Sequence, residues 1–289
     1  MEEFTNRLKF LKNKLPHASN LLHQIEEGKF NDRENNLTLN AIKNAYSRVL
    51  DQSVNTNEKL DVWVANQVLL TNQYINILKS PICQMFSHQS DFKSSVIPEL
   101  VCIIFHQINI REGLSLDVEG QNEVTIDLLF SHTNQGQVFP KNKRVDAALL
   151  MSFPLATPGA NRELEDFRIP LVAVEVKTNL DKNMISGIQH SVDKMKSTFP
   201  QCKYYVLSEF SDFNIAAQNY ASSSIDEIYI LRKQKRSEVR SGGIENLISE
   251  ELILEFTMSV SQIASSINNS DLDVASRLES GLLVDKKRV

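Results

Sequence analysis

The strongest constraint on the fold of this chain is an apolar run that starts at Leu171 and is interrupted near its end by charged residues. Apolar side chains fill both faces of the run, which is typical of a strand buried on two sides. Glu175 and Lys177 lie two positions apart, so they project from the same face of that strand. Burying a charge is costly unless the charge is paired or binds a metal. The pattern therefore indicates a functional site at the end of a core strand.

A second short apolar segment, Arg144–Leu150, carries Asp146 and predicts another strand. Two carboxylates from neighbouring strands can hold one or two Mg²⁺ ions through their oxygen atoms. Such ions offset the charge that develops on a scissile phosphate, and Lys177 can position or activate the attacking water. Asp146 followed by Glu175 and Lys177 is the pattern of Mg²⁺-dependent nucleases. The alternative for Glu175 and Lys177 is a structural ion pair at a strand end.

The distribution of apolar residues predicts an α/β (α+β) protein with a helical N-terminal region over residues 1–90 and a second unit over residues 91–289. The second unit is expected to begin with a helix over residues 91–110. The order strand, strand, helix, strand, strand then predicts a mixed central sheet flanked by helices. The further elements expected are strands at Glu123–Phe130, Lys203–Phe210 and Ile225–Leu231, a Pro- and Gly-containing excursion at Pro154–Pro170, and helices at Asn183–Phe199 and 244–268.

Composition narrows the range of partners. The net charge of −5 does not indicate nucleic-acid binding by the whole surface, so any DNA contact must be a local basic patch. No apolar run approaches the roughly 20 residues that span a bilayer, and the first residues lack the pattern of a signal peptide. Cys83, Cys102 and Cys202 are widely spaced and odd in number, which indicates reduced thiols. We therefore expect a cytoplasmic protein without a membrane partner.

Basic and amide side chains near the expected strands are candidate DNA contacts. The densest basic run, Arg232–Arg236, can bind phosphates and read base edges, whereas the alternative is a solvated surface segment. A smaller cluster precedes Asp146, and a polar loop follows Lys177. In that loop Asn183 can equally cap the next helix. The candidates for DNA binding are Lys143, Arg144, Asn179, Lys182, Asn183, Arg232, Lys233, Gln234, Lys235 and Arg236.

Glu99 lies near the start of the helix expected over residues 91–110. It can supply a third carboxylate to a metal site formed with Asp146 and Glu175. Spacing alone favours a simpler alternative, an exposed acid that interacts with the helix dipole.

Three blocks resemble a known family: VAVEVKTNLDKNMISG (Val172–Gly187), KMKSTFP (Lys194–Pro200) and IDEIYILRKQKR (Ile225–Arg236). They resemble the BbvCI-type family of type II restriction endonucleases, which are similar to the PD-(D/E)XK nuclease fold. The similarity runs from Ser94 to Arg240. Of the two kinds of subunit in the heterodimeric members, this chain is closer to the kind that carries EVKTN-x-DKN.

The resemblance implies a PD-(D/E)XK nuclease domain over residues 91–289 and a role in DNA recognition or dimerisation for residues 1–90. One departure is that Val145 stands where the signature has a proline before its Asp. The resemblance implies catalytic roles for Asp146, Glu175, Lys177 and Glu99, and Mg²⁺ binding at Asp146, Glu175 and Val176.

The activity that the resemblance implies is cleavage of double-stranded DNA at a short, interrupted and nearly symmetric site, leaving 5′-phosphate and 3′-hydroxyl ends. Each subunit cuts one strand, so the chain is expected to form a homodimer or to pair with a homologous second subunit. Two alternatives remain: a repair or structure-specific nuclease of the same fold, and a non-catalytic DNA-binding module with a degenerate nuclease fold.

Overall fold

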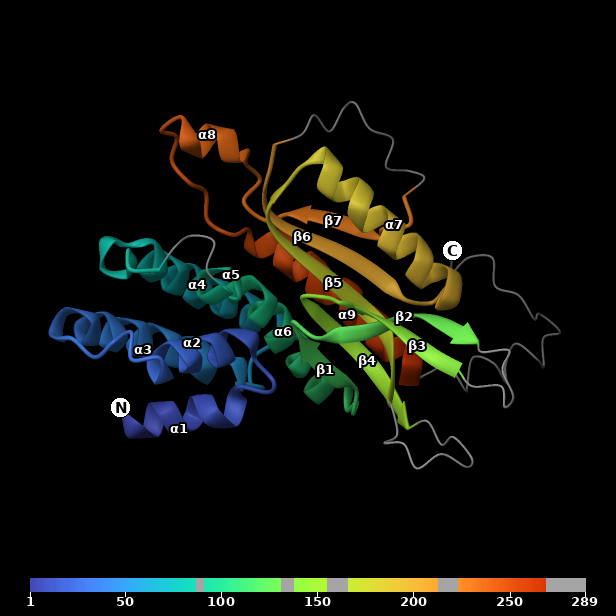
Figure 1. The fold of residues 1–289 in the computed structure, drawn as a ribbon, viewed down its shortest axis with the longest axis horizontal. Coiled ribbons are helices and arrows are strands. Elements are labelled where there is room, and N and C mark those ends of the chain that lie inside the picture. The colour runs from blue at the N-terminus through green and yellow to red at the C-terminus, as the bar shows by residue number, and fades with distance from the viewer. Residues whose placement is uncertain (87–90, 131–137, 155–165, 213–222, 269–289) are drawn as a thin grey trace.

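The computed structural model describes residues 1–86, 91–130, 138–154, 166–212 and 223–268. A group of helices lies at one end of the molecule and the main sheet at the other (Figure 1). Among the described helices, none is long and apolar enough to cross a lipid bilayer.

The N-terminal helices begin and end where local sequence signals place them. Pro16 opens α2, where its missing N–H is not needed. The Asp32 carboxylate caps α3 by accepting a hydrogen bond from the backbone N–H of Asn35 at 2.7 Å. Gly113, with a φ of 65°, adopts the left-handed conformation that ends α6. The elements are α1 (Glu2–Leu11), α2 (Pro16–Glu26), α3 (Arg33–Ser53), α4 (Leu60–Lys79), the 3-10 helix η1 (Pro81–Cys83), α5 (Asp91–Ser94) and α6 (Val96–Glu112).

The main sheet has five strands in the order β1-β4-β5-β6-β7. The pairs β1/β4 and β4/β5 are antiparallel, whereas β5/β6 and β6/β7 are parallel, so the predicted mixed sheet is confirmed. The other two strands, β2 and β3, form an antiparallel pair of their own. The strands are β1 (Asp117–Gly120), β2 (Glu123–Phe130), β3 (Val138–Arg144), β4 (Ala147–Pro154), β5 (Asp166–Leu180), β6 (Lys203–Ser211) and β7 (Glu227–Ile230).

Helices cover both faces of the main sheet. One face packs on α6 and α9 (Glu250–Asn268), and the other packs on α7 (Lys182–Thr198) and on β2 (Figure 1). The short helix α8 (Arg236–Arg240) follows β7. Because side chains alternate along a strand, neighbouring residues of β5 enter different cores: Val174 belongs to the α6/α9 side and Ala173 to the α7 side.

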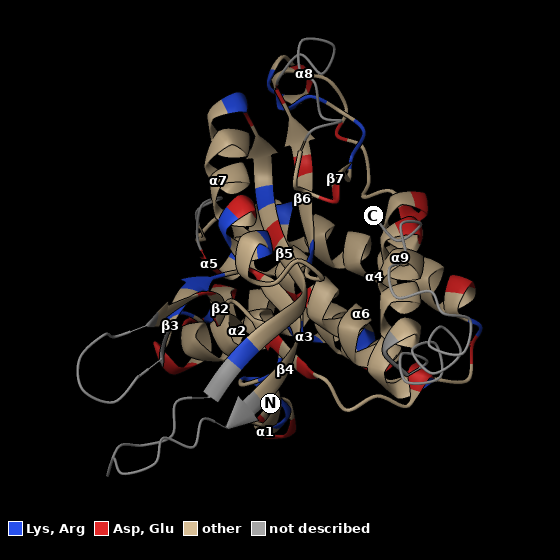
Figure 2. Ribbon diagram, turned by 90° about the vertical axis from the view of Figure 1, so that its right-hand side faces the viewer, with Lys and Arg blue, Asp and Glu red and all other residues tan. Residues whose placement is uncertain are grey.

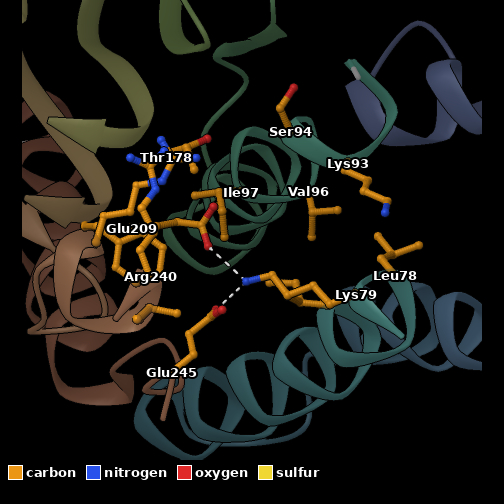
Figure 3. A pocket seen from close by; sticks show the side chains of 14 residues that line it. Leu78, Lys79, Lys93, Ser94, Val96, Ile97, Thr178, Glu209, Arg240 and Glu245 are labelled. Carbon is orange, nitrogen blue, oxygen red and sulfur yellow. Dashed lines mark hydrogen bonds and ion pairs between the residues drawn. The ribbon is translucent and has the colours of Figure 1, made fainter. Parts of the chain in front are cut away.

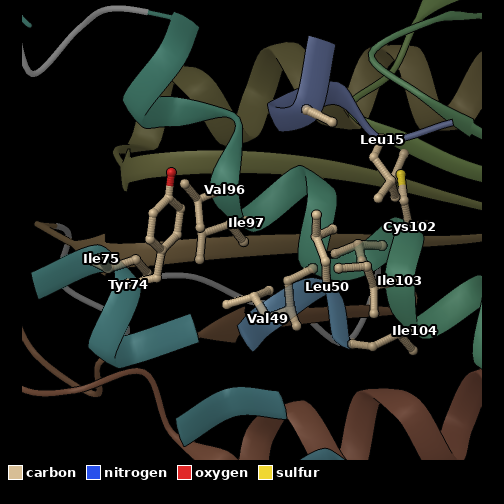
Figure 4. Close-up of a cluster of buried hydrophobic side chains, with 14 of the residues drawn as sticks. Leu15, Val49, Leu50, Tyr74, Ile75, Val96, Ile97, Cys102, Ile103 and Ile104 are labelled. Carbon is tan, nitrogen blue, oxygen red and sulfur yellow. The ribbon is translucent and has the colours of Figure 1, made fainter. Parts of the chain in front are cut away.

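The N-terminal helices share a core with the main sheet. One cluster of buried apolar side chains runs from Phe4 in α1 to Ala264 in α9. Figure 4 shows part of it, where Val49 of α3, Tyr74 of α4 and Ile97 of α6 come together. The helical region is therefore packed against the unit that contains the main sheet, and a domain boundary at residue 90 stays a prediction.

Several expected elements differ from the structure. The helix expected over residues 91–110 is divided at Ser95 into α5 and α6. β4 starts at Ala147, so Asp146 lies in the link before the strand and not inside it. The segment Pro154–Pro170, expected to connect two strands, is itself part of a strand at each end: β4 runs to Pro154 and β5 begins at Asp166. The residues between these two strands lie outside the described part of the chain. The last helix begins at Glu250, six residues later than expected.

Candidate active site

Asp146 is held against strand β5 by its side chain and its backbone. Its Oδ2 accepts a hydrogen bond from the Val176 N–H at 2.7 Å, and its own N–H donates to the Val174 carbonyl at 3.1 Å. The link between β3 and β4 is thus fixed to the strand that carries Glu175. The charges of Glu175 and Lys177 both act on the pKa of the Asp146 carboxylate, so the three groups lie close together.

Glu175 is the most heavily contacted carboxylate of this cluster. Its Oε2 accepts hydrogen bonds from the Tyr204 hydroxyl at 2.6 Å and from Lys143 Nζ at 2.9 Å. Its Oε1 lies 2.8 Å from Lys177 Nζ. The Glu175 side chain is 14% exposed, so two cations and a hydroxyl compensate a largely buried negative charge.

The two carboxylates have opposite pKa shifts. Burial acts to raise the pKa of Glu175, but hydrogen bonds from Lys177 and Tyr204 and the charge of Lys143 outweigh it and lower the pKa to about 2. Burial raises the pKa of Asp146, and the Val176 hydrogen bond and the Lys177 charge only partly offset that rise. Glu175 is therefore ionised throughout the physiological range, whereas Asp146 takes up a proton more readily than a free Asp.

Two residues extend the cluster beyond what the sequence suggests. Lys143, expected among the DNA contacts, points from β3 to Glu175 and also donates to the Tyr204 hydroxyl at 3.3 Å. Tyr204 is fully buried, and it pairs in register with Ala173 of β5. Burial raises the Tyr204 pKa, so the hydroxyl stays a neutral donor. Its strand, Lys203–Ser211, gives no sequence signal that separates Tyr204 from an ordinary core tyrosine.

Glu99 lies in a different environment from these carboxylates. It is only 2% exposed, so the exposed helix acid that spacing favoured is wrong. Its Oε1 accepts a hydrogen bond from the Tyr46 hydroxyl at 2.6 Å, and its Oε2 accepts one from the Ala18 N–H at 2.9 Å. No hydrogen bond or ion pair of the described residues joins Glu99 to Asp146 or Glu175. A catalytic role for Glu99 therefore stays a prediction.

The basic run after β7 divides into buried and exposed positions. Arg232 is 3% exposed, is paired with Glu209 at 2.6 Å, and lies over the Phe210 ring at 5.4 Å. This burial corrects the expectation that Arg232 is a DNA contact, because its guanidinium is used inside the protein. Lys233 pairs with Glu251 at 2.6 Å on the surface. The Gln234 side chain forms hydrogen bonds with the backbone of Ile244 and of Asn246. The next two residues differ in exposure, since Lys235 is exposed and Arg236 is half-buried.

The candidate contacts near the other strands are mainly at the surface. Arg144 is exposed before Asp146, and Lys182 and Asn183 are exposed in the first turn of α7. The N-cap of α7 is Asp181, whose carboxylate accepts from the Met184 N–H at 2.9 Å, so the capping alternative for Asn183 is wrong. Figure 2 shows Lys and Arg positions on β3, on β5 and in the segment beside α8.

Asn179 near the end of β5 is half-buried, and its side chain helps to lower the pKa of Asp212. Its Oδ1 is buried without a hydrogen-bond partner. Within the described ranges, no group of three or more His, Cys, Asp or Glu side chains is placed to hold a metal ion. Any ion at this site must therefore use the two carboxylates together with backbone oxygens or water.

Two comparisons with known proteins agree with this geometry. Residues 152–243, which include Glu175, Lys177 and the basic run, match the model of the Bpu10I restriction endonuclease family. A solved structure, described as the native BbvCI A2B2 tetramer at low resolution, superimposes with a TM-score of 0.68 and 25% sequence identity. The match covers 88% of this chain and 96% of that chain. No curated protein matches the chain. The family match and the shared fold confirm that this chain resembles the BbvCI-type restriction endonucleases.

Proposed function

We propose that the chain is a Mg²⁺-dependent type II restriction endonuclease, or one subunit of a heterodimeric one. It hydrolyses phosphodiester bonds of double-stranded DNA at a short, interrupted and nearly symmetric site and leaves 5′-phosphates. The observation that carries the proposal is the cluster of Asp146, Glu175 and Lys177 around strand β5, of which Glu175 and Lys177 lie in the region that matches a restriction endonuclease family.

The donor set of this cluster fits Mg²⁺, which prefers oxygen ligands and keeps several of its waters. Asp146 and Glu175 supply carboxylate oxygens. The Val176 N–H points to Asp146, and the carbonyl of a strand residue faces the same edge as its N–H, so Val176 offers a third oxygen there. When bound, the ion supplies charge neutralisation at the phosphate and lowers the pKa of the attacking water.

The protein residues have separate roles in this proposal. Glu175 is kept ionised by its cationic neighbours and is thus ready to bind a cation. Lys177 lies 2.8 Å from Glu175, so its ammonium group is placed to orient the attacking water and to contact the scissile phosphate. Asp146 holds its orientation through the Val176 hydrogen bond. Glu99 is retained as a candidate catalytic residue only through the family resemblance.

The proposal includes an assembly of more than one chain, because a nearly symmetric site is cut on both strands by two active sites. The related BbvCI structure is described as an A2B2 tetramer, which supports a homodimer or a homologous second subunit. A cytoplasmic location is also part of the proposal, and the three cysteines, all buried and unpaired, fit a reducing compartment.

The experiment that tests the proposal is digestion of long, unmodified duplex DNA with the purified chain in Mg²⁺, beside Glu175→Ala and EDTA controls. We expect discrete fragments that disappear in both controls, and the fragment ends then give the recognition site. Nicks at discrete positions on one strand indicate half of a heterodimer. Cleavage confined to branched or damaged DNA would replace the proposal with a repair nuclease. DNA binding without any cleavage, even with a homologous partner subunit present, would replace it with a binding module.

A further inference from the structure

Two ammonium groups contact the Glu175 carboxylate from different parts of the fold. Lys177 lies two residues away on the same strand, and its Nζ is 2.8 Å from Oε1. Lys143 comes from β3, which pairs only with β2 among the described strands, and its Nζ is 2.9 Å from Oε2. The contact with Lys143 therefore links a separate two-stranded sheet to the strand that carries the candidate active site.

Lys143 is directed inward from its strand. In the antiparallel register it stands opposite Val124, which is fully buried in the core on the α7 side, so both side chains lie on that side. Its neighbours Asn142 and Arg144 are exposed, whereas Lys143 is half-buried. A lysine turned toward a core costs free energy unless its charge is paired, and the ion pair with Glu175 provides that compensation.

The Glu175 carboxylate has little capacity left for a further partner. An ionised carboxylate accepts about four hydrogen bonds through its two oxygens. Oε2 already accepts from both Lys143 and the Tyr204 hydroxyl, and Oε1 contacts Lys177. Mg²⁺ approaches its oxygen ligands to about 2.0–2.1 Å in near-ideal octahedral geometry, and its charge repels ammonium groups on the same carboxylate. We therefore expect one of the present partners to move when the ion binds.

Lys143 is the partner that can leave. Tyr204 is fully buried and uncharged, and Lys177 shares its strand with Glu175, so neither can move far from the carboxylate. Lys143 reaches Glu175 from another sheet through a flexible side chain. Its Nζ also lies 3.3 Å from the Tyr204 hydroxyl and 5.7 Å from the centre of the Tyr204 ring, so it keeps a second contact after it leaves Glu175.

The charges of the site also favour the departure of Lys143. Asp146, Glu175 and Lys177 together carry one net negative charge when both acids are ionised. A bound Mg²⁺ changes this to one net positive charge, which a single phosphate group can neutralise. If Lys143 stayed in contact with Glu175, a second positive charge would remain without a partner in a largely buried site.

We propose that Lys143 is an internal competitor of the metal ion: its ammonium group occupies Oε2 of Glu175 and is displaced when the ion binds. The inference rests on the proposed function, because it takes Mg²⁺ binding at Glu175 as given. It makes Lys143 a positioning residue that acts on the ion through Glu175, whereas Lys177 stays beside the carboxylate. The competition weakens metal binding by the chain alone, since the ion must break the Lys143 contact.

The test is the affinity of the purified chain for Mn²⁺ without DNA, measured by electron paramagnetic resonance of the free ion. Mn²⁺ takes the same kind of oxygen ligands as Mg²⁺. Lys143→Gln is expected to bind Mn²⁺ at least about fivefold more tightly than the unaltered chain, the lower end of couplings between two ligands. Glu175→Ala is expected to lose this binding, which assigns it to that carboxylate. A lysine that only supports the site would give the opposite sign, with weaker binding in Lys143→Gln.

Arg144→Gln is the control for a simple loss of positive charge near the site. The charge of Arg144 acts on Asp146, but Arg144 forms no ion pair with Glu175 within the described residues. Its removal therefore reports the general effect of charge on ion affinity. We expect the change in Arg144→Gln to be clearly smaller than that in Lys143→Gln.

Two further variants control for loosening of the structure. Lys194→Gln removes the pair with Asp127, at 3.1 Å, which joins α7 to the same two-stranded sheet. Lys79→Gln removes a lysine that reaches from α4 to Glu245 and lies 3.9 Å from Glu209, far along the chain from β3 (Figure 3). Both variants are expected to bind Mn²⁺ as the unaltered chain does.

Displacement of the ammonium group can also be observed directly. Lysines of the unaltered chain are acetylated briefly with acetic anhydride, and the extent at each position is measured by mass spectrometry. Lys143 is expected to react faster in saturating Mg²⁺ than in EDTA, whereas Lys194 is expected to react at the same rate in both. An equal rate for Lys143 in the two conditions would contradict its displacement.

The outcomes separate this inference from the nuclease function. If the unaltered chain cuts DNA in Mg²⁺ but Lys143→Gln binds Mn²⁺ no more tightly than Arg144→Gln, the competition fails and the nuclease function stands. If Lys143→Gln binds the ion more tightly but the chain cleaves no DNA, even with a homologous partner subunit, the competition stands and the nuclease function fails. If neither the unaltered chain nor Lys143→Gln binds Mn²⁺, the competition is overturned.

Discussion

Glu175 and Glu99 are both largely enclosed carboxylates, yet their surroundings are of opposite kinds. Glu175, at the end of a core strand, contacts two ammonium groups and one hydroxyl. Glu99, in the first turn of α6, accepts hydrogen bonds from a tyrosine hydroxyl and a backbone N–H, and neither of these donors carries a charge. The difference shows which of two acids in a nuclease-like chain is prepared to carry a negative charge.

The consequence is visible in the protonation of the two groups. Burial alone would raise both pKa values, but the cations beside Glu175 reverse that effect and lower its pKa to about 2. At Glu99 burial dominates, and the hydrogen bonds from Tyr46 and Ala18 limit the rise to about 7. Glu175 is thus prepared to bind a cation, whereas Glu99 is divided between its neutral and ionised forms near pH 7.

The neighbours of Glu99 form a neutral polar cluster inside the helical region. His17 Nε2 lies 2.6 Å from the Tyr74 hydroxyl, and its Nδ1 lies 3.0 Å from the Ser95 hydroxyl. Burial lowers the pKa of His17 to about 3, so the imidazole is uncharged. Such satisfied polar groups join α2, α4 and the start of α6.

The largest effect that this comparison predicts is the loss of cleavage in Lys177→Ala. The change removes the ammonium group beside Glu175, and we expect DNA cleavage in Mg²⁺ to fall at least about 100-fold, as for other proton-transfer or positioning groups. Duplex binding in EDTA is expected to remain. The measurement is the single-turnover rate of fragment appearance.

Lys203→Ala is the matched control, because Lys203 is also a lysine paired with a carboxylate, Asp226, at 2.9 Å on the same sheet. It is expected to cleave at the rate of the unaltered chain. Equal losses in the two variants would mean that Lys177 supports the sheet and has no special part in the reaction.

A second prediction concerns Glu99 and the pH dependence of folding. Its folded pKa of about 7 exceeds the ordinary value of 4.5, so the folded state binds the proton more tightly than the unfolded chain does. The resulting stabilisation is present below pH 4.5 and is lost as the pH rises through 7, by an amount on the order of 3 kcal/mol. Glu99→Gln cannot ionise and lacks this loss.

The measurement is urea unfolding of both proteins at pH 5 and pH 8. We expect the free energy of unfolding of Glu99→Gln to rise relative to that of the unaltered chain as the pH increases. At both pH values the variant also lacks one of the two acceptor oxygens used by Tyr46 and Ala18. A difference between the two proteins that is the same at both pH values would place Glu99 in a charged state throughout, and would support its assignment to a metal site.

The sequence predicts the sheet better than it predicts the contacts across it. The strand carrying Glu175 and Lys177 is recognisable because two charges break an apolar run, and β2 begins and ends at the predicted residues. The sequence predicts that Asp146 lies near Glu175, as the structure shows, but it wrongly places Asp146 inside a strand. The hydrogen bond between Asp146 and Val176 cannot be inferred from the spacing of apolar residues. That contact depends on how β4 pairs with β5.

The remaining misses have the same cause. A run of basic residues has the same sequence pattern whether its side chains are solvated or buried. The sequence therefore does not show that Arg232, unlike Lys233, is buried beside Glu209 and Glu245. Glu99 likewise stands in the first turn of a helix, where an acidic residue is common and usually exposed. Only the packing of α2 and α3 against it shows that this acid is buried. Sequence patterns give the local element, whereas the partner across the fold decides whether a charge is available to a ligand.

The smallest predicted effect sharpens the comparison at Glu175 itself. Tyr204→Phe keeps the buried ring and removes only the hydroxyl that donates to Glu175 at 2.6 Å. Groups that orient a ligand in this way usually contribute about 10- to 100-fold to metal affinity or activity. Because Lys143 and Lys177 still contact Glu175, we expect the lower end, about a 10-fold fall in cleavage that higher Mg²⁺ partly restores.

Tyr205→Phe is the matched control on the next residue of the same strand, since Tyr205 faces the other core and its hydroxyl bonds Ser259 at 2.6 Å. Both variants lose one buried hydroxyl, so a general loss of stability would affect them alike. If only Tyr204→Phe needs more Mg²⁺ for half-maximal cleavage, then the hydroxyl acts through Glu175. If the two variants need the same Mg²⁺ concentration, then Lys143 and Lys177 alone keep Glu175 ionised. Glu175 and Glu99 would then differ in pKa only because cations lie beside the first and not beside the second.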